Sequence, residues 1–147
     1  MHSALLHAHS GLRWIALLLL IVAIFNASKS QNSGQYLKKD KMLNLFAMIF
    51  MHIQLLIGLG LYFISPKVNF VEGWMKESLL RFFGMEHILL MIIAIAVITM
   101  GRSKAEKKLK GSRDKHRKIM VSYTIGLIIV LISIPWPFRE ALGAGWM

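Results

Sequence analysis

Long apolar segments alternate with short polar segments along the chain. The four longest stretches without a charged residue comprise 15, 25, 15 and 20 residues. A helix needs about 20 residues to cross a hydrocarbon layer of roughly 30 Å, so the two longer stretches suffice and the two shorter ones must extend past a charged residue. The pattern predicts one all-α domain over residues 1–147, an integral membrane four-helix bundle with helices at 5–25, 42–64, 79–100 and 119–134.

The amino-acid composition supports a membrane protein and narrows its chemistry. Hydrophobic residues make up 56% of the 147 residues and charged residues 17%, which is too apolar for a soluble domain of this size. The chain has no cysteine, which excludes a disulfide framework, thiolate zinc sites and cysteine-ligated iron–sulfur clusters. A metal or cofactor must therefore be held by histidine, methionine, carboxylates or burial.

Basic residues are concentrated between the apolar stretches. Of the 18 lysines and arginines, 13 lie in segments 26–41 and 101–118, whereas the connecting segment 65–78 has only two. Basic connections remain in the cytoplasm, so we expect both termini to lie outside, N-out and C-out. The net charge of +11 then predicts contact with anionic lipid headgroups rather than with nucleic acid. His116, in the second basic segment, should be solvated.

Ionisable residues within a span are costly and by default functional, and we single out five of them, from three of the expected spans. They are His9, Arg13, His52, Glu86 and His87. A rise of about 1.5 Å per residue from the cytoplasmic helix ends places all of them between the mid-plane and the outer interface. Arg13 and Glu86 have opposite charges at similar depth, which predicts a buried ion pair; the alternative is that Arg13 binds the carboxylate of a ligand.

The histidines suggest a haem site. Haem b requires two axial imidazoles on facing helices at matching depth, apolar walls and cations near its propionates. The depths of His52 and His87 differ by only about 5 Å, as do those of His9 and His87, so either pair is suitable. Arg13 lies on the outward side, where propionates should point. Two alternatives stay open: a haem-free polar cluster, and a quinone or another metal bound by the same histidines and Glu86.

Several motifs along nearly the whole chain resemble those of a known group of proteins. They are His9-Ser-Gly-Leu-Arg-Trp14, His52-Ile-Gln-Leu-Leu-Ile-Gly58, Glu86-His87 and Ile134-Pro-Trp-Pro-Phe-Arg139. The pattern resembles small four-helix bacterial membrane proteins labelled cytochrome b or cytochrome b-like and, more loosely, cytochromes of the b561 type. The resemblance implies a multi-pass protein of the bacterial inner (cytoplasmic) membrane, with His52 and His87 as axial ligands of the haem iron and His9 as the competing ligand.

These observations predict an electron-transfer protein that passes electrons between quinol and a partner redox protein. Three histidines within the spans suit one haem b rather than two. The chain has no Ser-His-Asp arrangement, phosphate loop or metal-hydrolase spacing, so we expect an electron-transfer subunit rather than a stand-alone enzyme. The alternative is a haem-free accessory subunit that packs against other subunits of a larger respiratory or transport complex.

Overall fold

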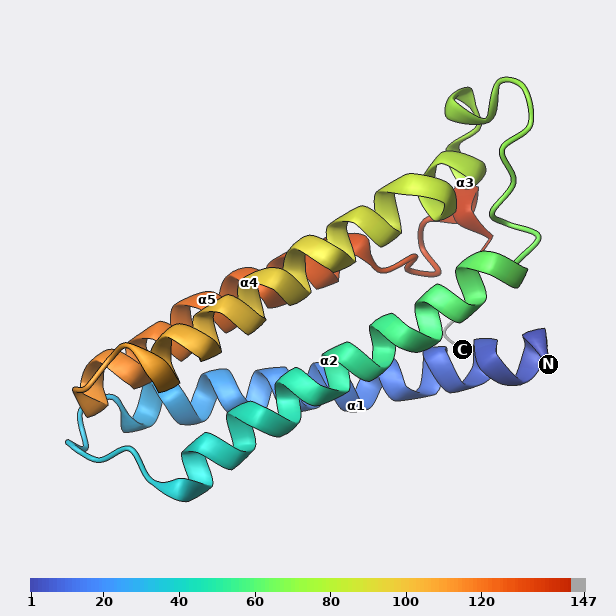
Figure 1. The fold of residues 1–147 in the computed structure, drawn as a ribbon. Coiled ribbons are helices and arrows are strands. Elements are labelled where there is room, and N and C mark those ends of the chain that lie inside the picture. The colour runs from blue at the N-terminus through green and yellow to red at the C-terminus, as the bar shows by residue number, and fades with distance from the viewer. Residues whose placement is uncertain (144–147) are drawn as a thin grey trace.

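The computed structural model describes residues 1–143, which form an elongated bundle of helices without strands (Figure 1). The helices are α1 (His2–Ser30), α2 (Lys38–Ile64), α3 (Ser78–Arg81), α4 (His87–Lys107) and α5 (Ser112–Ser133). One π-helical turn, Phe82–Glu86, joins α3 to α4, so that Ser78–Lys107 is continuous. Four helices are long and apolar enough to cross a membrane, which confirms the predicted all-α, four-helix architecture.

The four long helices are arranged around a common axis. α1 packs against α2 and α5, and α4 packs against the same two helices, so α1 and α4 lie across the diagonal of the bundle. We call the end with the connections 31–37 and 108–111 the basic end. The other end, with the N-terminus, the connection 65–77 and the segment after α5, is the pocket end (Figure 1).

Aliphatic and small side chains fill the interior, and large apolar side chains also cover the outside. Fully buried core residues include Leu20, Ala23, Ala94, Ile98 and Tyr123. Outward-facing side chains that are more than half exposed include Leu18, Leu56, Leu89 and Ile132. An exterior with many exposed apolar side chains is suited to contact with lipid chains rather than with water.

α4 and α5 approach each other closely through glycine and serine. A Cβ atom on Gly101 would lie 2.0 Å from the Oγ atom of Ser122, and one on Gly126 would lie 2.5 Å from a side-chain carbon of Ile98. Small residues at such contacts allow the backbones of two helices to pack tightly. α5 therefore supports α4, the helix that carries His87.

The helices extend beyond the predicted boundaries at the basic end. Segment 101–118, expected to be a long basic connection, is mostly helical, and only 108–111 joins α4 to α5. An uncharged stretch marks the part of a helix suited to the hydrocarbon layer, whereas lysine, arginine and glutamate are themselves good helix formers. Most of the basic residues therefore lie on helix ends rather than in a loop.

The prediction that His116 is solvated is wrong. Its side chain is completely buried, with Nε2 2.8 Å from the backbone oxygen of Gln35 and 3.9 Å from a carboxylate oxygen of Asp40. The connection 31–37 contacts the imidazole through Gln35 and Tyr36, whose ring centroid lies 4.9 Å from that of His116. Neighbouring basic residues indicate a polar surface, but they do not reveal that a loop distant in sequence lies on top of it.

His116 belongs to a polar cluster at the basic end, made of Tyr36, Asp40, Asn44, Glu106 and His116. The hydroxyl of Tyr36 donates to Glu106 and accepts a 3.1 Å hydrogen bond from the amide of Asn44. Asp40 accepts a 2.8 Å bond from the backbone N–H of Leu37, at the start of α2. Burial, together with the nearby carboxylate of Glu106, raises the pKa of Tyr36, so its hydroxyl keeps the proton that it donates.

Candidate functional site

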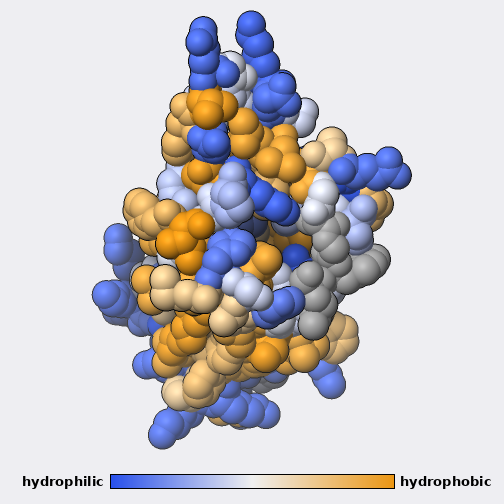
Figure 2. All heavy atoms as spheres, turned by 90° about the vertical axis from the view of Figure 1, so that its right-hand side faces the viewer, coloured by the Kyte–Doolittle hydropathy of each residue, from blue (hydrophilic) through white to orange (hydrophobic). Residues whose placement is uncertain are grey.

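A cavity of about 300 Å³ lies among the helices at the pocket end, which is within the range of roughly 300 to 1,000 Å³ for small-molecule sites. Figure 2 looks onto this end and shows a hollow where hydrophilic and hydrophobic side chains meet. The polar lining residues are His9, Ser10, Arg13, Gln54, Tyr62, Ser65, Lys67 and His87. The apolar walls include Leu17, Leu55, Leu59, Met91 and Ile95.

The orientation of His87 is set by the end of α5. Its Nδ1 atom lies 2.7 Å from the backbone oxygen of Ser133. In a longer helix this oxygen would accept from the N–H of residue 137, but Pro137 has none. Because a carbonyl only accepts, Nδ1 carries the hydrogen, and the neutral ring keeps a lone pair on Nε2. A backbone carbonyl on one ring nitrogen is how proteins commonly orient a histidine for binding metal through the other.

The π-helical turn Phe82–Glu86 immediately precedes His87. Such turns take one residue more than an α-helical turn and are frequent at functional sites. The hydroxyl of Tyr62 on α2 donates a 2.9 Å hydrogen bond to the backbone oxygen of Gly84 within the turn. The ring of Phe82 lies 5.7 Å from that of His87. The extra residue thus changes the direction in which the side chains of α4 point relative to those of α3. The hydroxyl of Tyr62 connects α2 to this turn.

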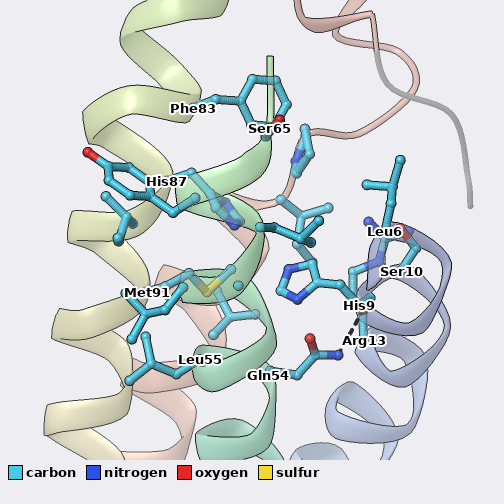
Figure 3. A pocket seen from close by; sticks show the side chains of 18 of the residues that line it. Leu6, His9, Ser10, Arg13, Gln54, Leu55, Ser65, Phe83, His87 and Met91 are labelled. Atoms are coloured by element: carbon cyan, nitrogen blue, oxygen red, sulfur yellow. Dashed lines mark hydrogen bonds between the residues drawn. The ribbon is translucent and has the colours of Figure 1, made fainter. Parts of the chain in front are cut away.

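His9 on α1 faces His87 across the cavity (Figure 3). The centroids of the two imidazole rings are 6.3 Å apart and their planes are inclined by 79°. Gln54 on α2 donates a 3.0 Å hydrogen bond to the backbone oxygen of His9. The Nδ1 atom of His9 is buried and has no hydrogen-bond partner within residues 1–143. The sequence-based pairing of His9 with His87 is therefore possible in this fold.

His52 lies outside the cavity, although it was expected to ligate haem together with His87. Its Nδ1 atom is 2.8 Å from the backbone oxygen of Met48, and its Nε2 atom is 3.5 Å from the hydroxyl of Thr99. Thr99 is 12 residues beyond His87, or about 18 Å along the helix. His52 and Gln54 are two residues apart and so point to different sides of α2. Since Gln54 faces the cavity, His52 cannot.

Glu86 does not make the predicted ion pair with Arg13. It pairs instead with Arg81, whose Nε atom is 2.6 Å from a Glu86 carboxylate oxygen. Glu86 precedes His87 by one residue and therefore points about 100° away from it around the helix. Arg13 lines the cavity, with its guanidinium group 5.2 Å from the ring of Trp14.

Lys67 is a cavity residue that the sequence reasoning missed. It lies in the connection after α2, and its ammonium group is 4.9 Å from the ring of Phe83, another cavity-lining residue. Nothing in the sequence distinguishes this lysine from other lysines near helix ends. Lys67 and Arg13 are thus two cationic side chains that line the cavity.

Within residues 1–143, no three histidine or carboxylate side chains come together in a way that could hold a metal ion. The cavity instead offers two opposed imidazoles, which suits a metal whose remaining ligands belong to a cofactor. Comparison of the chain with protein-family models, curated proteins and solved structures gives no match.

Proposed function

We propose that this protein is a membrane electron-transfer protein that binds one haem b between His9 and His87. The observation that carries the proposal is the opposition of these two imidazoles across one cavity, with centroids 6.3 Å apart. Metal–imidazole bonds are about 2 Å long, so two such bonds and the two ring radii require centroids about 6 Å apart. The centroid separation of His9 and His87 agrees with this spacing, so this pair replaces His52 and His87 in the proposal.

The other cavity residues also suit this cofactor. Leucine, methionine and isoleucine side chains form apolar walls for a macrocycle, and Arg13 and Lys67 supply cations for two propionates. Haem supplies reversible one-electron transfer when bound. The residues of this chain orient the two imidazoles, exclude water and balance the charge of the carboxylates.

The proposed location is the inner membrane of a bacterium, in a multi-pass arrangement. Basic residues near helix ends remain in the cytoplasm, which assigns the basic end to the cytoplasmic side and the cavity to the outer half of the bilayer. A quinol in the bilayer and a redox protein or membrane subunit at the outer surface are the expected electron partners.

A reduced-minus-oxidised visible spectrum of the protein in detergent tests the proposal. We expect an α-band in the wild type, its loss in His9→Ala and in His87→Ala, and its retention in His52→Ala, which removes an imidazole from a span outside the cavity. Size-exclusion chromatography verifies that each variant remains folded. Loss of the band in His52→Ala but not in His9→Ala would refute the assignment of ligands.

A wild-type protein that is folded, supplied with haem and still without an α-band would refute the haem proposal itself. A quinone-binding assay then distinguishes the two remaining functions, a quinone-binding protein and a haem-free accessory subunit. A quinone that binds wild type but not His9→Ala indicates a quinone site in the same cavity. If the wild type binds neither haem nor quinone, the result supports a haem-free accessory subunit of a larger complex.

A further inference from the structure

We infer that Gln54 and Gly58 form a seat on α2 that fixes the position and ring orientation of His9. This inference rests on the proposed function, because it assigns the seat a role in setting the geometry of an axial ligand. The motif His52–Gly58 was expected to contribute a ligand through His52. In the structure, the motif instead contacts His9, the proposed ligand on α1.

Gln54 holds the backbone of α1 at the residue that carries the imidazole. Its side-chain amide donates a 3.0 Å hydrogen bond to the backbone oxygen of His9, and only 7% of its surface is exposed. The bond is part-buried, and leaving one of its two polar groups unpaired there is costly. It therefore resists sliding or rotation of α1 against α2 at this level of the bundle.

Gly58 leaves the space that the ring of His9 occupies. Residues 54 and 58 are four apart and lie on one face of α2. A Cβ atom on Gly58 would be 3.3 Å from Cε1 and 3.8 Å from Nδ1 of His9, and no other atom beyond the neighbouring chain and helix lies within 4 Å. A methyl group here must therefore push or turn the imidazole, and it disturbs nothing else.

The ring of His9 has no hydrogen bond at Nδ1 within residues 1–143, whereas the ring of His87 is held by the Ser133 carbonyl. The 79° angle between the two ring planes is thus set on one side by α5 and on the other by the seat. Because ligand orientation and hydrogen bonding tune a haem iron, movement of His9 should change both haem affinity and the spectrum of the oxidised iron.

The variant Gly58→Ala and the matched control Gly60→Ala test the seat. Both substitutions replace a glycine in α2 by a better helix former, but a Cβ atom on Gly60 would meet only a side-chain atom of Leu5, at 4.0 Å. Haem content per protein and the electron paramagnetic resonance spectrum of the oxidised protein are measured for the full-length chain. We expect a shifted low-spin signal and lower haem content in Gly58→Ala, with Gly60→Ala equal to wild type.

Gln54→Leu provides the second test, because leucine keeps the volume and removes the hydrogen bond. Loss of a group that orients a metal ligand typically lowers metal affinity about 10- to 100-fold, and we expect a loss of this order in haem affinity. Wild-type haem content and spectrum in both Gly58→Ala and Gln54→Leu would overturn the inference, as would equal changes in Gly58→Ala and Gly60→Ala.

A readout without haem separates this inference from the proposed function. Diethyl pyrocarbonate modifies accessible imidazoles, and mass spectrometry gives the rate at His9 and His87 separately in the haem-free protein. We expect Gly58→Ala to change the rate at His9 but not at His87, and Gly60→Ala to change neither. If wild type lacks an α-band, this result still supports the seat, and an unchanged rate at His9 overturns it.

Discussion

The two ends of the bundle bury polar side chains in different ways. At the basic end, every member of the polar cluster makes a hydrogen bond to another residue packed at that end: Tyr36 bonds to Glu106, Asn44 bonds to Tyr36, and His116 bonds to the backbone, while Oδ1 of Asn44 and Nδ1 of His116 have no partner within residues 1–143. At the pocket end, His9 and His87 face each other across an open cavity. Polar groups that satisfy one another hold helices together, whereas polar groups arranged around a cavity are available for a ligand.

The largest expected effect contrasts one histidine from each end. His87→Ala should abolish haem binding and leave the bundle folded, because the imidazole faces a cavity. His116→Ala should keep the haem content of the folded protein but lower its stability by about 1–3 kcal/mol, because buried polar partners lose a hydrogen bond. Absorbance spectra and thermal unfolding in detergent measure both quantities. Loss of haem in both variants, at equal stability, would remove the distinction between the two ends.

Asp40→Ala should have the next largest effect, and only on stability. The carboxylate accepts 2.8 Å bonds from the backbone of Leu37 and from the amide of Asn26, so it joins the start of α2 to the end of α1. Removal leaves buried donors unpaired and should cost about 1–3 kcal/mol. Thermal unfolding checks this value, with Asp114→Ala at the exposed start of α5 as the control. Equal unfolding temperatures in the two variants would contradict it.

Tyr36→Phe should destabilise the protein at neutral pH by about 1–2 kcal/mol, because its hydroxyl donates one hydrogen bond and accepts another, each with a net value of about 1 kcal/mol. The pKa of Tyr36 is raised in the fold, so the hydroxyl contributes to stability below the unfolded pKa of about 10, and this contribution is lost as the pH rises above that value. The difference in stability between wild type and Tyr36→Phe should therefore shrink at alkaline pH. A difference that grows with pH would have the wrong sign.

Tyr62→Phe should have the smallest effect. It removes the bond from the hydroxyl to the backbone of Gly84 in the π-helical turn, and Tyr62 is only half-buried. We expect a loss of stability of about 1 kcal/mol or less, together with a modest decrease in haem content, because His87 follows directly after this turn. A haem content as low as that of His87→Ala would mean that Tyr62 itself binds the ligand.

Much of the fold follows from the sequence, but only part of the site does. Uncharged stretches predicted all four long helices, and depth along the helix axis grouped His9 with His87, whose ring centroids are 6.3 Å apart. The same reasoning admitted His52, which matches in depth but lies on another side of α2. It also paired Arg13 with Glu86, although Arg81 lies nearer to that carboxylate. The depth of a residue along its helix follows from its residue number, whereas the direction of its side chain relative to the other helices depends on packing.

The number of helices, their apolar surface and the position of the basic residues were determined by the sequence itself, because each depends on consecutive residues and on the thickness of a hydrocarbon layer. Which imidazoles meet was decided by the tertiary structure. A π-helical turn rotates the start of α4, Pro137 leaves the oxygen of Ser133 for His87, and Gly58 leaves space for His9. These are contacts between helices, and their direction is fixed only once the bundle has packed.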